Sequence, residues 1–246
     1  MEKIRLQKFF TDNKIMSRRN AEKVIAAGNV KINGQTAKLG DKVDPQSDVV
    51  TFNGKVIKSD NSKKRYIMLN KPIGYVSTSS DEKGRPCVTD LVSDVGERVY
   101  PVGRLDMFSD GLILMTNDGE FANRLTHPKS SIAKKYSVLI KGEISPETLR
   151  MLTSPMELDG YKIRPVGVHI ISVKNGNTNA LFTLREGRNR QIRKMCEKCS
   201  LTVMKLTRIA IGSVKLGDLE KGKWRDLTDS EIDYLCGKKD DGKCLR

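Results

Sequence analysis

The sequence is poor in the residues on which many metal centres and charge-relay triads depend. Its 246 residues include two histidines, His127 and His169, and five cysteines. Zinc sites and serine or cysteine triads usually rely on histidine, and these two lie far apart along the chain. Such sites therefore have little support.

Long hydrophobic runs are also missing. No apolar stretch approaches the ~18 residues of a membrane-spanning helix. The opening residues, MEKIRLQKFF, lack both the apolar segment and the small-residue cleavage site of a secretory signal. We therefore expect a cytoplasmic protein with no membrane partner, in which the cysteines are reduced.

The cysteines do not form the pattern of a complete metal site. Cys196 and Cys199 have the spacing of half a zinc site or of a redox pair. No second pair stands at partner spacing. We interpret both as thiols of a helix, in the core or on the surface.

What the sequence has in excess is positive charge. Lysine and arginine total 45 against 30 aspartates and glutamates, which gives a net charge of +15. A basic excess of this size is typical of proteins with a polyanionic partner, nucleic acid before membrane. Hydrophobic residues make up 37% of the chain, enough for one ample core or for two domains.

A change in composition divides the chain. The polar, charged stretch SDNSKKR at 59–65 looks like a linker. We predict a small domain at 1–60, a linker at 61–65, a larger domain at 66–235 and a disordered tail at 236–246.

The small domain has the pattern of two helices on a small sheet. An apolar helical pattern begins at residues 5–10, and Ser17 can cap a second helix that ends at Gly28. Asn-Gly at 33–34 and at 53–54 predicts two tight hairpins.

The larger domain mixes short strands with a few helices, which predicts an α+β fold on a mixed, largely antiparallel sheet with flanking helices. Strands are expected at 66–70, 74–78, 111–116, 135–140 and 180–184. Helices are expected at 119–125 and at 188–199. A further helix is expected to begin after Ser145, which can serve as its N-cap.

Basic residues gather on the predicted helices of the small domain. Residues 1–60 carry 12 lysines and arginines against 7 acidic residues, which could also be an ordinary solvated surface. The order RLQK, SRRxA and GxVxING, however, closely resembles the S4 RNA-binding domain. The resemblance implies that structured RNA is bound by Arg5, Lys8, Ser17, Arg18, Arg19 and Lys23.

One carboxylate stands out in the larger domain. Asp106 ends the segment GRLD, just before a Ser-Asp-Gly turn and the apolar run LILM. A lone aspartate can be a turn cap or an ion-pair partner. A glycosidase that pairs Asp106 with Asp110 is also conceivable. Asp110 in a turn is poorly placed for that role, and a sugar cleft usually needs more aromatic residues than the 5% present here.

Two further features lie downstream. Tyr136 opens an alternating strand, and residues 184–198 carry six basic residues against two glutamates. Within that stretch Arg190 and Arg193 stand one predicted helical turn apart, with Ile192 toward the core. An exposed basic helix is the alternative interpretation.

Together these segments resemble the pseudouridine synthases, and more narrowly the RsuA/RluB-type branch, which acts on ribosomal RNA and carries an N-terminal S4 domain. The resemblance covers residues 3 to about 235. It rests on GRLD, the tyrosine after paired lysines and GRNRQIR, together with the segments LNKPxG, TNDGE and GKWRDL.

The resemblance implies a catalytic role for Asp106 in breaking the C1′–N1 bond of a uridine and rejoining the base at C5. Asp106 either attacks C1′ or removes a C2′ proton, and both routes stay open. Arg193 would keep Asp106 charged, since burial raises the pKa of a carboxylate. Tyr136 would stack on uracil and relay a proton, and Arg104 would extrude the nucleotide. Substrate contacts are implied for Arg104, Leu105, Leu184, Arg190 and Ile192.

The reaction is redox-neutral and not a hydrolysis, so the resemblance implies no cofactor and no metal. The implied partner is ribosomal RNA, of the large subunit rather than the small one, and a monomer is the default of the branch. The competing hypothesis is a non-catalytic RNA-binding ribosome-assembly factor on the same scaffold. The target uridine is not determined by the sequence.

Overall fold

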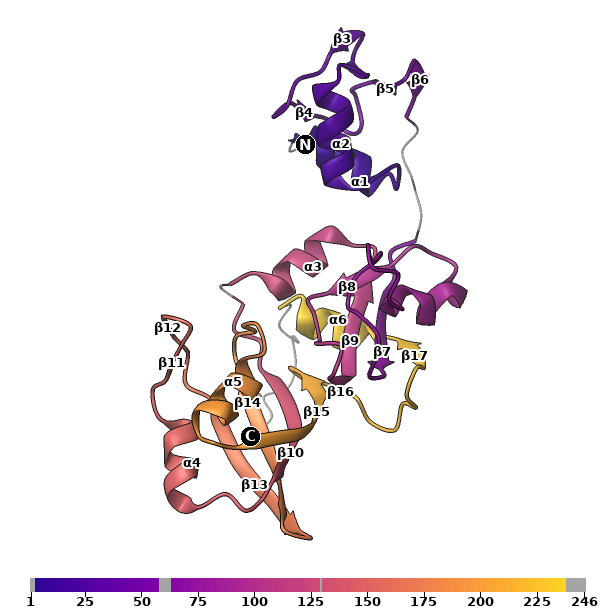
Figure 1. Ribbon diagram of the computed structural model, residues 1–246. Coiled ribbons are helices and arrows are strands. Elements are labelled where there is room, and N and C mark those ends of the chain that lie inside the picture. The colour runs from indigo at the N-terminus through magenta and orange to yellow at the C-terminus, as the bar shows by residue number, and fades with distance from the viewer. Residues whose placement is uncertain (1–2, 58–62, 129, 238–246) are drawn as a thin grey trace. The chain divides into compact units, whose positions relative to one another are not determined.

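The computed structural model describes residues 3–57, 63–128 and 130–237 (Figure 1). The chain divides into two compact units, Met1–Lys63 and Lys64–Arg246. The predicted linker lies partly, and the predicted tail mostly, outside the described residues. Within the described ranges, no helix combines the length and hydrophobicity needed to cross a membrane.

The first unit packs two helices on small antiparallel sheets. Helices α1 (Leu6–Asp12) and α2 (Arg18–Ala26) enclose Phe10 and Ile25 in its core. As predicted, the Ser17 side chain caps α2 by accepting a hydrogen bond from a backbone amide. One sheet pairs β1 (Ile4–Arg5) with β4 (Lys42–Val43), and the other has the order β3 (Gln35–Thr36), β2 (Val30–Ile32), β5 (Val50–Phe52) and β6 (Lys55–Val56).

The two predicted hairpins are present. Asn33 and Asn53 both have positive φ angles, of 50° and 49°, and each is followed by a glycine with positive φ. Two consecutive residues of this conformation form the turn that matches the twist of paired strands. These turns link β2 to β3 and β5 to β6.

The second unit is built on a nine-stranded sheet. Its central order is β13-β14-β10-β15-β9-β7-β17, with β8 paired to β9 and β16 paired to β15. The strands are β7 (Tyr66–Lys71), β8 (Tyr100–Val102), β9 (Asp110–Thr116), β10 (Lys134–Lys141), β13 (Gly167–Lys174), β14 (Asn177–Leu184), β15 (Thr202–Ile211), β16 (Val214–Lys215) and β17 (Trp224–Asp226). Among these strands only the β9–β15 pair is parallel. The predicted α+β fold on a largely antiparallel sheet is confirmed.

Helices flank this sheet. They are α3 (Gly119–Thr126), α4 (Pro146–Thr153), α5 (Gln191–Lys198) and α6 (Asp229–Leu235), with a 3-10 segment η1 (Val88–Val95). Figure 1 shows α4 and α5 with the β10, β13 and β14 part of the sheet, and α3 and α6 with β8 and β9. A separate hairpin joins β11 (Glu157–Leu158) to β12 (Tyr161–Lys162).

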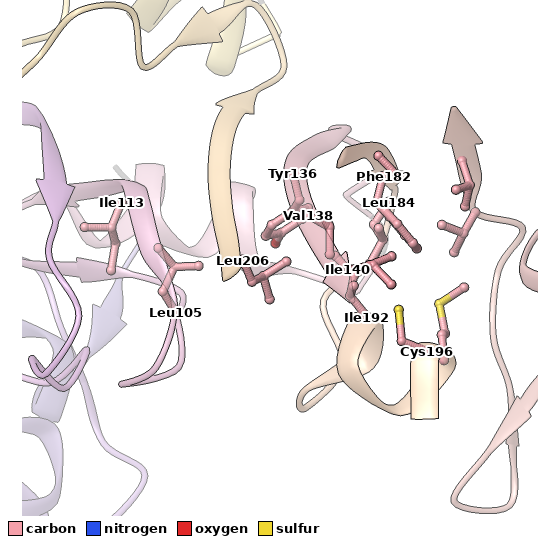
Figure 2. Packing of buried hydrophobic residues seen from close by; sticks show 14 of the residues in the cluster. Leu105, Ile113, Tyr136, Val138, Ile140, Phe182, Leu184, Ile192, Cys196 and Leu206 are labelled. Carbon is pink, nitrogen blue, oxygen red and sulfur yellow. The ribbon is translucent and has the colours of Figure 1, made fainter. Parts of the chain in front are cut away.

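Strand β9 is buried on both faces. Its alternate residues Ile113 and Met115 belong to one hydrophobic cluster, while Leu112 and Leu114 belong to another. The larger cluster continues across β10 to α5, whose Ile192 and Cys196 face the sheet, as Figure 2 shows. Burial on both faces explains why LILM is continuously apolar rather than alternating.

Three predicted elements differ in the structure. Residues 74–78 form one isolated bridge instead of a strand, because Gly74 has φ +95° and turns the chain away from the sheet. Helix α5 starts at Gln191 rather than at 188 because Arg190, its N-cap, has φ +50°. Asp110 belongs to strand β9 rather than to a turn.

Candidate active site

The segment that carries Asp106 is a tightly held loop at residues 103–109, between β8 and β9. Ser77 Oγ donates a hydrogen bond to the Leu105 carbonyl at 2.8 Å and accepts one from the Leu105 amide at 3.0 Å. The Ser109 amide donates to the Asp106 carbonyl at 3.0 Å, which closes a turn within the loop. The backbone on both sides of the carboxylate is therefore immobilised.

Two cations hold the far end of this loop. The buried Lys71 Nζ donates to the Ser109 carbonyl at 2.8 Å. Arg193 Nη2 reaches from α5 and donates to the Phe108 carbonyl at 2.8 Å. The loop thus connects to β7 and to α5 through charge-assisted hydrogen bonds, which are stronger than neutral ones.

Asp106 itself is half-buried and faces Arg190. Arg190 Nη1 lies 3.8 Å from Asp106 Oδ2, and both side chains are partly open to solvent. An ion pair of this exposure contributes little to stability. It does place a fixed positive charge beside the carboxylate.

Arg193 was the predicted ionic partner of Asp106, and the structure places it differently. Its guanidinium donates to the carbonyls of Phe108 and Val203, and its Nε has no acceptor. Burial and the nearby charge of Arg190 lower the pKa of Arg193, while the charge of Asp106 opposes that change. Arg190 is therefore the residue at ion-pair distance from Asp106, and Arg193 holds the Asp106 loop through the Phe108 carbonyl.

A cavity of about 410 Å³ opens beside Asp106. This volume is typical of a site for a small ligand or a single nucleotide. Its lining includes the predicted residues Arg104, Leu105, Asp106, Tyr136, Leu184, Arg190 and Ile192. Tyr136 is 8% exposed, and Leu184 and Ile192 form apolar walls beside it (Figure 2). Four segments of the chain therefore bring the predicted residues, except Arg193, to one cavity.

Asp110 does not share this cavity. Its carboxylate is 1% exposed, pairs with Lys221 Nζ at 3.0 Å and accepts a hydrogen bond from Thr207. Burial alone would raise the pKa of Asp110, but the contacts with Thr207 and Lys221 outweigh burial and hold it below its ordinary value. A buried carboxylate that pairs with Lys221 outside the cavity does not support a paired-carboxylate glycosidase.

The sequence did not single out several residues of the cavity. Lys134 and Arg208 line its floor, and Tyr161, Arg164 and Arg188 line its rim. Lys134 could have been found, since it lies two residues before Tyr136 on a strand and therefore shares its face. Arg208 could not, because its place depends on which strand pairs with β10.

The cysteine pair is part of the core. Cys196 and Cys199 are buried, and burial raises the pKa of the Cys196 thiol to about 12. The described residues contain no cluster of three or more histidine, cysteine or acidic side chains that could hold a metal ion. Of the two positions left open by the sequence, core or surface, the structure places both thiols in the core.

The basic residues of the first unit are arranged differently from the prediction in one respect. Arg5 precedes α1 in extended conformation and donates to the Gly40 carbonyl at 2.7 Å, so it does not share a helix face with Lys8. Arg18, Arg19 and Lys23 lie on α2 and are exposed.

Comparisons with known proteins agree with this geometry. Residues 65–198 match the family model described as RNA pseudouridylate synthase. The chain belongs to this family. Residues 4–50 match the S4 domain model, so both predicted resemblances are confirmed. Membership of the family makes this pseudouridine synthase an isomerase that acts on RNA.

The relatives of this synthase cover it nearly from end to end. "Ribosomal large subunit pseudouridine synthase B" of Bacillus subtilis is 40% identical over 97% of this chain and 98% of its own. "Dual-specificity RNA pseudouridine synthase RluF" of Escherichia coli is 38% identical over 93% of this chain and 77% of its own. A solved pseudouridylate synthase superposes with a TM-score of 0.69 at 31% identity, covering 94% of this chain and 99% of its own.

Proposed function

We propose that this synthase converts a uridine of ribosomal RNA to pseudouridine, with Asp106 as the catalytic carboxylate. The observation that carries the proposal is the position of Asp106 in the wall of the cavity, on a loop held by Ser77, Lys71 and Arg193. A carboxylate fixed before the substrate arrives does not have to be reorganised during the reaction.

The reaction breaks the C1′–N1 bond, forms a C1′–C5 bond and moves a proton from C5 to N1. Asp106 acts on the ribose in one of two ways: it attacks C1′, and the bond from Asp106 to C1′ breaks when C5 bonds to C1′, or it removes the C2′ proton and returns it to C2′ when C5 bonds to C1′. Arg190, rather than Arg193, is the cation that faces the Asp106 carboxylate, since it is the one at ion-pair distance. The reaction is redox-neutral, so we propose that no cofactor takes part.

The other residues of the cavity hold the base. Tyr136 stacks on the flipped uracil and accepts or relays the C5 proton, between the apolar side chains Leu184 and Ile192. Arg104 is exposed at the mouth of the cavity, where it can occupy the gap left by the extruded nucleotide.

The S4 domain supplies affinity for the RNA. Arg18, Arg19 and Lys23 are exposed on α2 and can contact several phosphates, as expected for recognition of folded RNA by shape and backbone. The name of the Bacillus subtilis relative supports the large ribosomal subunit as the source of the target. We propose that the synthase works as a monomer in the cytoplasm.

The test is tritium release from ribosomal RNA labelled at C5 of uridine. We expect Asp106→Asn to abolish release while leaving RNA affinity within about twofold of the wild type, because the carboxylate acts in the chemical step. Asp218→Asn is the matched control, since Asp218 is exposed and does not line the cavity. Release that persists in Asp106→Asn would exclude the assigned role.

A further inference from the structure

Two cations that line the more buried side of the cavity, which we call its floor, have no counter-ion among the described residues. Lys134 and Arg208 both line the cavity, and neither forms an ion pair with any carboxylate of the described residues. Arg208 is 3% exposed. Its Nε donates to the Leu112 carbonyl at 2.6 Å, while its Nη2 is buried without an acceptor. An unbalanced buried charge is costly, so the site is built for a negative group that arrives later.

The register of the sheet places these cations beside Tyr136. Lys134 and Tyr136 lie two residues apart on β10, so their side chains share a face. Tyr136 stands opposite Arg208 of β15, and Lys134 stands opposite Leu184 of β14. Residues opposite one another in an antiparallel pair also share a face. The cations therefore border the surface on which the base is proposed to stack.

The two cations disfavour one another's charge, and a negative group beside them would relieve this repulsion. Burial, and then the charge of Arg208, lowers the pKa of Lys134. The carboxylates that line the cavity, Asp106 and Glu186, already have partners, since Asp106 faces Arg190 and Glu186 accepts hydrogen bonds from the Arg164 amide and the Gln191 side chain. A negative group at the floor would meet both cations where little solvent screens them.

The position of the exposed arginines favours an anionic base, rather than a phosphate group, as the negative group at the floor. The exposed Arg104, Arg188 and Arg190 lie at the mouth, where the RNA backbone must stay. A base extruded from the RNA could extend past them to the buried Arg208. We propose that Lys134 and Arg208 stabilise the negative charge that develops on uracil when its glycosidic bond breaks.

The chemistry is the same in both routes open to Asp106. When the C1′–N1 bond breaks, its electron pair remains on N1 and spreads onto O2 and O4. C5 then bonds to C1′, the C5 proton leaves and N1 regains a proton. Cations that face the ring where this charge appears lower the barrier to bond cleavage. The inference rests on the proposed function and deepens it.

The experiment compares two bases that differ in how readily they leave C1′ as an anion. The target uridine is compared with 5-fluorouridine at the same position, because the fluorine stabilises the uracil anion without help from the protein. Loss of the starting nucleoside is followed in single turnovers by digestion and chromatography, because 5-fluorouridine has no C5 proton to release and reports only cleavage of the C1′–N1 bond and bonding of C5 to C1′. We expect Lys134→Met to slow the reaction of uridine by about 100-fold, the loss typical of one removed charge-stabilising donor. The reaction of 5-fluorouridine should slow by about 10-fold or less, because its anion needs less stabilisation from the protein. Lys134→Arg should restore most of the rate on uridine.

Controls separate this role from a structural one and from phosphate binding. Lys135→Met is the matched variant, since Lys135 points to the opposite face and is exposed. Arg208→Lys keeps the charge and tests the second cation without emptying its site. Equal losses on both substrates, or a weaker RNA affinity with a reduced salt dependence, would overturn the inference. A wild type that releases no tritium would instead overturn the proposed function.

Discussion

At the scale of single residues, the site is defined by which cation meets which acceptor. Arg190 lies beside the carboxylate of Asp106, whereas Arg193 and Lys71 donate to backbone carbonyls of the same loop. Arg190 therefore acts through its charge beside Asp106, whereas Arg193 and Lys71 hold the loop in position. If these cations exchanged partners, the net charge of the site would stay the same, but the loop would no longer hold the Asp106 carboxylate in this position.

Lys71 provides a test of this buried network. Burial lowers the pKa of Lys71 to about 8, although the charges of Asp110 and Asp106 partly oppose that change. Between pH 8 and the ordinary value of 10.5, the unfolded chain binds more protons at this group than the folded chain. The wild type should therefore gain stability relative to Lys71→Met as the pH rises through this window, by up to about 3 kcal/mol.

Urea unfolding of both proteins at pH 7.5 and at pH 10 measures that difference. Subtracting the variant removes the titration of all other groups that the two proteins share. Parallel pH dependences would show that Lys71 is not charged and buried in the folded protein.

At the scale of elements, the parallel contact between β9 and β15 positions the cavity. Gly111 has φ +103°, and a Cβ on it would lie 2.3 Å from the backbone oxygen of Arg208. The close approach brings β15, with Arg208, next to the start of β9 and its preceding loop. Only glycine permits both the backbone angle and the distance.

Gly111→Ala should therefore destabilise the second unit by about 3–5 kcal/mol, from strain and overlap combined. Gly217→Ala is the control, since Gly217 also has positive φ, of 59°, but open space around it. The control should lose about 1 kcal/mol from strain alone. Urea denaturation gives both values, and equal losses would contradict a special packing role for Gly111.

At the scale of the whole molecule, the chain combines an S4 domain with a unit that contains the candidate active site. The net charge of +15 is spread over both, with exposed cations on α2 and around the mouth of the cavity. Affinity of this kind depends on salt, because each neutralised phosphate releases counter-ions.

Arg18→Ala combined with Arg19→Ala should weaken binding to ribosomal RNA and flatten its dependence on salt by roughly one or two units of slope. Lys31→Ala combined with Lys55→Ala removes the same charge from exposed positions on the small sheet. Filter binding at several salt concentrations compares the two pairs. An unchanged slope in the arginine variant would show that α2 does not contact phosphate.

The sequence by itself determined what depends on neighbours along the chain. The Ser17 cap, the Asn-Gly turns, the alternation of β10 and the family motif around Asp106 are all local patterns, and short-range sterics and hydrogen bonds decide them. They were sufficient for the fold class, the family and seven residues that line the cavity.

Only the tertiary structure decided what depends on strand order and on the termini of elements. The left-handed N-cap at Arg190 gave that residue, and not Arg193, the place beside Asp106. The pairing of β10 with β15 brought Arg208 opposite Tyr136, a position 72 residues away in sequence. Such contacts follow from how the sheet closes around a shared core, and no local pattern specifies that closure.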